Sequence, residues 1–196
     1  ELVGQEAFLV YEDQYDGSWE RGWYSFSEIF PEVDLWRYTR QEALQQVLRR
    51  FACRQVAFDS KMAKDFYRLP EKEIRAAISA LCAAGELVGQ DGAYMLKEDA
   101  ALLASYVPEP MHFVRAMHRN DFLVRSNEHA LKAKFQPLCD PLPYDHEVLQ
   151  YLLIDGEFRG AVVGHFRNGP YDLNGIVLDV PALLERREEI LQVHAA

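Results

Sequence analysis

Basic side chains are concentrated in one stretch of the sequence, between His112 and Lys134, where only Asp121 and Glu128 oppose them. Arginine and lysine form charge-assisted hydrogen bonds with phosphate oxygens. The stretch is therefore a candidate phosphate-binding surface. The alternative is a solvated surface that balances acidic residues elsewhere in the chain. Its members are Arg115, Arg119, Arg125, Lys132 and Lys134, with His112, His118 and His129.

A second group of basic side chains precedes this stretch in the sequence. It would extend the same surface if the fold brought the two groups together, because each phosphate contact rests on charge neutralisation. Its members are Arg49, Arg50, Arg54, Lys61, Lys64 and Arg68.

Other site chemistries find little support in the sequence. His112 and His118 are six residues apart, which is not the spacing of zinc ligands on a helix, and no Cys-x-x-Cys pair is present. The glycines of Gly156–Gly160 fall in an expected hairpin rather than before a helix, so they do not form a phosphate-binding loop. We therefore predict no metal and no cofactor. Catalytic residues stay unassigned, because a triple such as His118, Asp121 and His165 is one of many in a chain of this size.

The helices expected to carry the second basic group begin at a capping box. Thr39 and Glu42 have the spacing in which each side chain bonds the backbone of the other. Apolar residues then recur at the spacing of one helical face. These are Leu44, Val47, Leu48 and Phe51.

Two more helices are expected next. Asp59 or Ser60 begins a short helix, and Arg68-Leu69 forms a tight connection to a third helix with Pro70 in its first turn. Ile74, Ala77, Ile78 and Leu81 give the third helix its apolar face, and Gly85 ends it.

Leu87-Val88 and Tyr94–Leu96 flank Asp91-Gly92, which is a strong hairpin signal. Three helices followed by a hairpin is the order of a winged helix, with the second and third helices as the helix-turn-helix. In DNA-binding members the third helix enters the major groove. Its cations here, Lys72 and Arg75, are offset by two carboxylates, so the alternative is a unit used for packing or protein contact.

The rest of the chain is predicted to be mostly β. A short helix at Ala100–Tyr106 precedes a mixed region, and Pro137, Pro141 and Pro143 mark a loop. Asp155-Gly156 and Asn168-Gly169 turn between strands, and Pro181 opens a final helix with Leu184 and Leu191 on one face. The expected strands and helix span Val148–Ile154, Phe158–Phe166, Ile176–Val180 and Ala182–Val193. The predicted class is α+β: a winged helix-turn-helix, then a small antiparallel β-barrel-like unit and a C-terminal helix.

The N-terminal residues 1–38 form a third expected segment, acidic and rich in aromatics. Gln5 to Tyr11 indicates a strand and Asp16-Gly17-Ser18 a turn. This density of aromatics is unlike a disordered tail. We expect the segment to pack on this chain, on a protein partner, or on a preceding domain now missing, because the chain starts at Glu1 rather than at methionine. The predicted domains are 1–38, 39–107 and 108–196.

Charge and cysteine content limit the class of protein. The net charge of −10 divides into −7 for residues 1–38, +1 for 39–99 and −4 for 100–196, which argues against strong non-specific phosphate binding but allows a local basic face. Three scattered cysteines do not make a disulfide framework. Cys53 and Cys82 are expected to be small buried hydrophobes. No apolar run is long enough to span a membrane, and we expect a cytoplasmic protein.

Several motifs together resemble one family. Phe51–Leu96 looks like a winged-helix segment, and His118–Arg125 carries an aspartate followed four residues later by an arginine. Tyr151–Leu178, with Asp155-Gly156 and Arg159-Gly160, looks like a C-terminal β-barrel. Residues 40–196 are thus similar to the C-terminal part of the bacterial crosslink-repair DNA glycosylases.

That resemblance implies ancestry and nucleic-acid contact, but not an active site. The family's catalytic signature is Gln-x-Gln or Gln-x-Asp in an earlier winged helix. Gln14-Tyr15-Asp16 has these letters without the helical context, and it lies too close to the following winged helix. Only Asp121 and Arg125 carry over, as architecture.

The function expected from these observations is a DNA-binding winged-helix module, related to DNA repair glycosylases or to accessory domains of DNA enzymes. One alternative is a structural or protein-interaction module without nucleic-acid binding. A second is an active DNA glycosylase, a hydrolase. The predicted nucleic-acid-binding residues are Lys72, Arg75, Arg115, Arg119, Arg125, Lys132 and Lys134.

Overall fold

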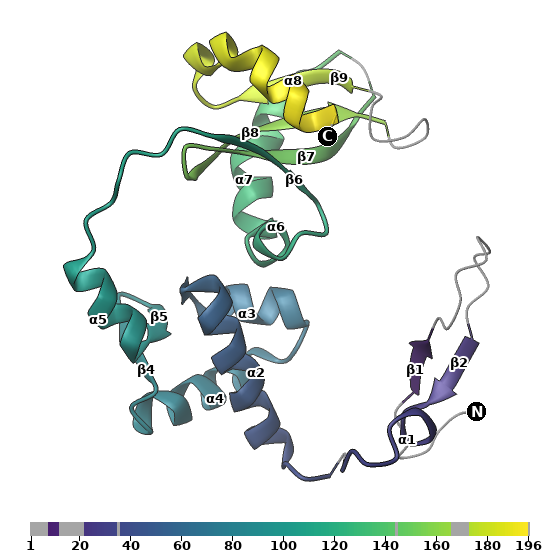
Figure 1. The fold of residues 1–196 in the computed structure, drawn as a ribbon, viewed down its shortest axis with the longest axis vertical. Coiled ribbons are helices and arrows are strands. Elements are labelled where there is room, and N and C mark those ends of the chain that lie inside the picture. Colours follow the sequence, from purple (N-terminus) through teal and green to yellow (C-terminus); the bar gives the residue numbers. More distant parts are fainter. Residues whose placement is uncertain (1–7, 12–21, 35, 144, 166–172, 196) are drawn as a thin grey trace. The chain divides into compact units, whose positions relative to one another are not determined.

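The computed structural model describes residues 8–11, 22–34, 36–143, 145–165 and 173–195. It is half helical and about a quarter strand, which confirms the predicted mixed α+β class. The chain divides into two compact units, residues 1–43 and 44–196. The finer division at residues 38 and 107 stays a prediction. Figure 1 shows the elements along the chain.

The first unit contains an antiparallel strand pair. Strand β1 (Phe8–Tyr11) pairs with β2 (Gly22–Ser25), and helix α1 (Phe26–Ile29) follows directly. Part of the predicted strand Gln5–Tyr11 is therefore observed, while its first three residues lie outside the described residues. The expected turn at Asp16-Gly17-Ser18 also lies outside them.

Helix α2 (Arg40–Gln55) begins at the predicted capping box. Thr39 N donates to Glu42 Oε2 at 2.8 Å, and Glu42 N donates to Thr39 Oγ1 at 3.3 Å. These bonds satisfy backbone N–H groups that a helix start leaves without partners. The helix then buries one face in the core, as the spacing predicts, through Leu44, Leu48, Phe51 and Ala52.

Helices α3 (Ser60–Tyr67) and α4 (Glu71–Ala83) follow in the predicted order. The Asp59 carboxylate accepts from Met62 N at 2.7 Å and caps α3. Arg68 has φ of +54°, in the left-handed region, which ends α3 and allows the sharp turn into α4. Gly85 ends α4's last turn with φ of +72°.

A three-stranded sheet completes this region, with order β3-β5-β4. Strands β4 (Leu87–Gln90) and β5 (Ala93–Leu96) form the predicted hairpin, and positive φ values at Asp91 and Gly92 make its turn. Strand β3 (Ala57–Phe58) was not predicted, because two residues are too short to show an alternating pattern. Helix α5 (Lys97–Ser105) starts directly after β5.

The C-terminal sheet is antiparallel, with strand order β6-β7-β8-β9. Its strands are β6 (Val114–His118), β7 (Glu147–Ile154), β8 (Glu157–Gly164) and β9 (Leu173–Leu178). The expected turn at Asn168-Gly169 lies outside the described residues.

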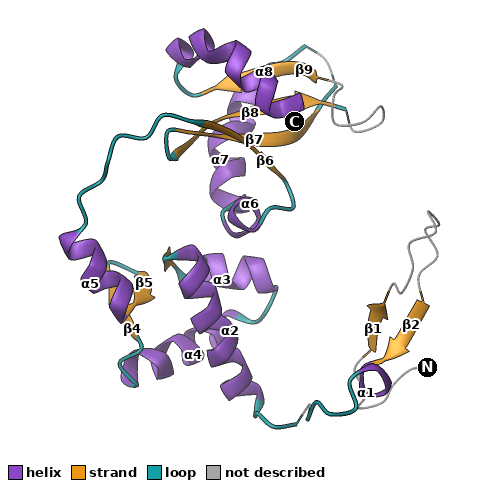
Figure 2. Cartoon of the chain, viewed as in Figure 1, coloured by secondary structure: helices purple, strands orange, loops and turns teal. Residues whose placement is uncertain are grey.

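The predicted barrel-like closure is wrong: the sheet is open, with β6 and β9 at its edges. A helix covers each face, so the apolar side chains of both faces are buried without closure. Helix α7 (Glu128–Cys139) packs on one face, where Phe135 meets Tyr151. Helix α8 (Arg187–Ala195) packs on the other, where Ile190 meets Leu152. Figure 2 shows the helices on the two sides of these strands.

The final helix differs in part from the prediction. Its first segment, η2 (Pro181–Arg186), is a 3₁₀ helix, and α8 continues it. This shift of winding leaves Leu184 exposed, while Ile190 is the fully buried residue. The predicted face of Leu184 and Leu191 is therefore wrong.

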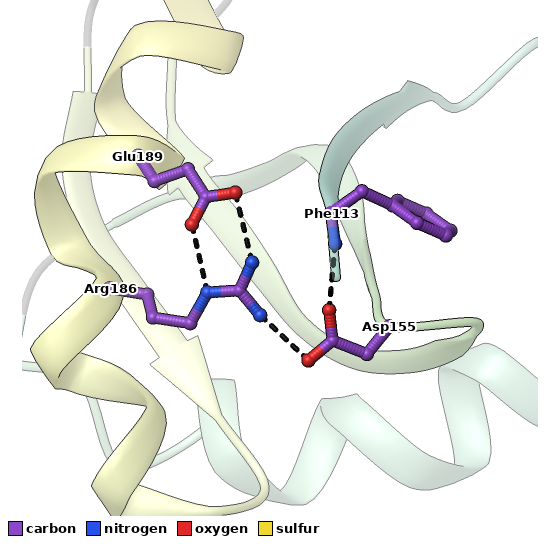
Figure 3. Close-up of polar contacts among 4 residues, drawn as sticks. All are labelled: Phe113, Asp155, Arg186 and Glu189. Carbon is purple, nitrogen blue, oxygen red and sulfur yellow. Dashed lines mark hydrogen bonds and ion pairs between the residues drawn. The ribbon is translucent and has the colours of Figure 1, made fainter. Parts of the chain in front are cut away.

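A polar network fixes the start of this C-terminal helix (Figure 3). Arg186 donates to both oxygens of Glu189 at 2.8 and 2.9 Å and to Asp155 Oδ2 at 2.8 Å. The other Asp155 oxygen accepts from Phe113 N at 2.8 Å. Hydrogen bonds from Arg186 hold the pKa values of Asp155 and Glu189 below the ordinary carboxyl range. The β7–β8 turn, the chain before β6 and α8 are thus tied together.

Two further expectations are corrected. Pro137 lies inside α7 rather than in a loop; because proline has no N–H to bond the carbonyl one turn earlier, it weakens the helix there, and α7 ends two residues later at Cys139. Cys53 is exposed on α2, because the buried face of that helix passes through Leu48 and Ala52 instead. Cys82 is partly exposed, and Cys139 is the buried thiol.

Within the described residues, no helix is both long and apolar enough to cross a membrane.

Candidate nucleic-acid interface

Helix α4 carries two of the predicted cations, Lys72 and Arg75, both exposed. Arg75 forms two hydrogen bonds to Glu71 Oε1, at 2.9 and 2.6 Å, one turn earlier on the helix. These bonds hold the pKa of Glu71 below its ordinary value, and the charge of Lys64 adds to this effect. Lys64, on α3, therefore lies near the start of α4.

Arg125 and Lys132, from the basic stretch between His112 and Lys134, line a hollow of about 430 Å³. Its opposite wall is α3, which contributes Lys61, a residue 64 positions before Arg125 in the sequence. Lys61 Nζ lies 2.8 Å from His129 Nε2. An ammonium group can only donate, so this ring nitrogen accepts. Lys61 of the earlier basic group thus lies on the same hollow as Arg125 and Lys132 of the later stretch.

The same hollow contains three carboxylates, and two have partners within the fold. Asp59 is engaged in capping α3. Glu128 accepts from Lys132 Nζ at 2.6 Å, and this bond, followed by the charges of Lys132, Arg125 and Arg68, lowers the Glu128 pKa. The third carboxylate is Asp65. Arg68, at the end of α3, therefore belongs to the same basic neighbourhood.

Aromatic packing positions the walls of this hollow. Helix α6 (Phe122–Ser126) begins at Asp121, whose carboxylate accepts from Leu123 N at 2.8 Å. The Phe122 ring packs against Phe51 of α2 and Phe66 of α3. Asp121 and Arg125, the two positions carried over from the family resemblance, are thus the cap and a residue of helix α6. The Phe122 ring docks this helix on α2 and α3.

A polar contact supports this docking. Ser126 Oγ donates to Gln55 Oε1 at 2.7 Å, which joins α6 to the end of α2. Ser126 is buried, so the bond satisfies a hydroxyl that would otherwise be costly to bury. Helix α6 is therefore held by apolar contacts with α2 and α3 and by this hydrogen bond to α2.

A second hollow, of about 350 Å³, lies against the C-terminal sheet. Predicted residues Arg119 and Lys132 line it, and Arg119 Nη1 lies 3.9 Å from Glu147 Oε2. Most of its lining residues were not predicted from the sequence. For the two of them on α7, Gln136 and Cys139, the available signal was the helical spacing from Lys132, because residues three or four apart share a helix face. The missed residues are Gln136, Cys139, His146 and Tyr151.

Two predicted cations lie elsewhere. Lys134 Nζ is 2.7 Å from Asp179 Oδ2 and donates to the Phe158 carbonyl oxygen at 2.6 Å. It therefore ties α7 to the sheet. Arg115 is exposed on edge strand β6, with its guanidinium 5.7 Å from the Phe113 ring centre. Neither lines the two hollows.

Groups considered for catalysis serve local structure where they are described. His118 Nδ1 accepts from Asn120 N at 3.1 Å, and Asp121 caps α6. Gln14-Tyr15-Asp16 lies outside the described residues. Across the part of the chain that the structure describes, no three His, Cys, Asp or Glu side chains are grouped to hold a metal ion.

Comparison of the chain with protein-family models, with curated proteins and with solved structures found no match.

Proposed function

We propose that this protein binds nucleic acid through residues of α3, α6 and α7, with α4 as a second contact. The observation that carries the proposal is the convergence of Lys61, Arg125 and Lys132 on one hollow. Cations from distant parts of a sequence that share one surface can neutralise adjacent phosphates of one backbone. A solvated surface that merely balanced charge would need no such convergence.

The proposal includes a winged-helix unit over residues 40–96. Its support is the element order α2-β3-α3-α4-β4-β5, with a three-stranded sheet in which the hairpin strand β5 is central. A tight turn at Arg68 separates the second and third helices. In such a unit α4 is the helix that enters the major groove. Lys72 and Arg75 are then its contacts, and Arg75 would have to exchange Glu71 for a phosphate or base edge.

Kinship with the C-terminal part of bacterial crosslink-repair DNA glycosylases remains part of the proposal. It is supported by the order of a helical unit, then strand β6, then α6 with its Asp121 cap and α7, then the remaining strands of the antiparallel sheet and a final helix. The open sheet differs from the barrel expected of that family. The proposed role is therefore binding, as a module of a DNA repair or other DNA enzyme, without a catalytic step assigned to this chain.

A specific observation favours a protein-interaction module as the second candidate. Large apolar side chains are exposed on α5 and in the segment that follows it. Contiguous exposed apolar surface is typical of protein-binding sites. The residues are Leu102, Leu103, Tyr106, Val107 and Met111.

The deciding experiment is fluorescence anisotropy with labelled single- and double-stranded DNA at about 50 and about 200 mM salt. We expect micromolar binding that weakens steeply at the higher salt. The variant Arg125→Ala should weaken binding about ten-fold at low salt, since it removes one cation of the hollow. The matched control is Arg187→Ala, which removes an exposed arginine from α8, outside both hollows.

Absence of binding at either salt would refute the proposal and leave the protein-interaction module. Equal losses for Arg125→Ala and Arg187→Ala would show that only net charge matters, and the hollow would then not be the interface.

A further inference from the structure

The second hollow is a different kind of space from the first. One face of α7 forms a wall through residues at helical spacing, Glu128, Lys132, Gln136 and Cys139. The start of β7 and the buried Tyr151 lie opposite. Its volume of about 350 Å³ is within the range of small-ligand sites, about 300–1,000 Å³.

Charges around this hollow are matched in pairs. Lys132 lies 2.6 Å from Glu128, and Arg119 lies 3.9 Å from Glu147. Two cations and two carboxylates leave the lining without a strong net charge. A simple anion would meet two carboxylates here, and a simple cation would meet two basic groups. The lining therefore favours an uncharged ligand that offers both hydrogen-bond donors and acceptors.

The floor is apolar, with neutral polar atoms. Val124, Cys139 and Tyr151 are all nearly fully buried. Burial raises the pKa values of the Cys139 thiol and the Tyr151 hydroxyl, so both keep their protons at neutral pH. Tyr151 is one of the residues that line this hollow. A tyrosine hydroxyl can both donate and accept a hydrogen bond, so it is a suitable contact for a ligand in the hollow.

We propose that this hollow binds a neutral, planar, hydrogen-bonding heterocycle of the nucleobase class. The apolar floor accepts the ring, and Tyr151, Gln136 and Glu128 present a hydroxyl, an amide and a carboxylate. Gln136 Nε2 donates to Asp140 and Glu128 accepts from Lys132, so a polar ring edge would share or replace these exposed bonds. A nucleobase combines these properties, since its ring face is apolar and its edge carries donors and acceptors.

The position of the hollow connects it with the proposed interface. Glu128 and Lys132 line both hollows, so one ion pair forms a shared wall. A strand whose phosphate lies in the first hollow would have an unstacked base within reach of the second. This link rests on the proposed function; binding of a free nucleoside does not.

The test uses the full chain and uncharged nucleosides, namely adenosine, guanosine, cytidine and thymidine, at about 1 mM. Saturation-transfer NMR should detect binding of at least one of them. Gln136→Trp places a large side chain at the exposed rim of the hollow and should weaken binding at least about ten-fold. Leu138→Trp is the matched control, because it adds a similar bulk to the same helix outside the lining, and it should leave binding unchanged.

A second arm separates the two sources of the base. A single-stranded oligonucleotide is compared with an abasic strand of equal length and charge. Weaker binding of the abasic strand to the wild type, but not to Gln136→Trp, supports a base of a strand as the occupant. Equal binding of both strands, together with nucleoside binding, supports a free nucleoside.

Folding of each variant is checked by circular dichroism. The proposal is overturned if no nucleoside binds the folded wild type, or if Gln136→Trp binds as well as Leu138→Trp. Salt-sensitive DNA binding without nucleoside binding would overturn this inference alone. Nucleoside binding without DNA binding would support it and refute the proposed function instead.

Discussion

The C-terminal sheet is covered by a helix on each face, and the two helices use their charged side chains differently. On the α8 side, the Arg186 side chain is only 15% exposed and is bonded to two carboxylates from two elements. On the α7 side, Lys132 is 62% exposed and forms an ion pair with Glu128, one turn away. An exposed pair within one helix contributes little to stability. It can therefore exchange its partner for a ligand, whereas the Arg186 network is part of the fold.

The same contrast separates Lys132 from Lys134, which are two residues apart on α7. Lys134 reaches Asp179 and the Phe158 carbonyl on the sheet, while Lys132 lines both hollows. Residue type and local sequence are alike. What distinguishes a structural cation from a candidate binding cation is the direction in which the helix presents it.

The largest expected effect concerns the core under α8. Ile190→Ala should lower the free energy of unfolding by about 2–4 kcal/mol, because it leaves a cavity at a fully buried position. Leu184→Ala, on the exposed 3₁₀ segment, should cost less than about 0.5 kcal/mol. Urea unfolding measures both. Similar losses of unfolding free energy for the two variants would support the predicted buried face at Leu184 and contradict its exposure in the structure.

Arg186→Ala comes next. It removes three hydrogen bonds to carboxylates, and we expect a loss of about 1–2 kcal/mol, given that the carboxylates are near solvent. Its neighbour Arg187 is exposed and lies 3.3 Å from Glu188 Oε1. Arg187→Ala should therefore change the free energy of unfolding by less than about 0.5 kcal/mol. Equal effects would mean that the network does not stabilise α8.

The buried His194 gives the α8 side a pH dependence. Its Nδ1 lies 2.5 Å from Gln150 Oε1, its Nε2 is buried without a partner among the described residues, and burial lowers its pKa. The unfolded chain then binds the proton more readily than the folded one. The contribution of neutral His194 to the free energy of unfolding should be fully present above the ordinary histidine pKa of about 6.5. It should decrease as the pH falls below that value.

When unfolding takes up one proton, the free energy of unfolding changes by at most about 1.4 kcal/mol per pH unit. Urea unfolding at several pH values between about 7.5 and 5 measures it. His194→Leu cannot take up this proton, so its slope should be smaller than that of the wild type. Identical slopes would show that His194 is protonated without cost in the folded state.

The smallest expected effect separates the two lysines of α7. Lys132→Ala should weaken DNA binding several-fold, by about 1 kcal/mol, and reduce the salt dependence by about one phosphate contact. Lys134→Ala should leave DNA affinity unchanged and lower the free energy of unfolding instead. Anisotropy and urea unfolding on both variants give a two-way comparison. If Lys134→Ala also weakened DNA binding, the distinction between the two lysines would fail.

Sequence patterns predicted those parts of this protein whose causes are local. The capping box of Thr39 and Glu42, the cap at Asp59 and the turn at Asp91-Gly92 each depend on residues within a few positions of one another, and each is confirmed. The helices of the region 40–83 and most strands follow, because apolar spacing reports which face is buried. Helices α1, α6 and α7 were not predicted. The strands β7 and β8 are nearly continuous apolar runs, as expected for a sheet buried on both faces, but this pattern does not distinguish that from a closed barrel.

Only the tertiary structure decided which charged side chains share a surface. Lys61 and His129 are 68 positions apart and meet because Phe122 docks α6 on α2 and α3. Arg186 and Asp155 meet for a similar reason, through the packing of Ile190 under α8. Sequence fixes the number of charges and their local spacing. Long-range packing of apolar side chains then determines which charges become partners, which line a hollow, and which remain in solvent.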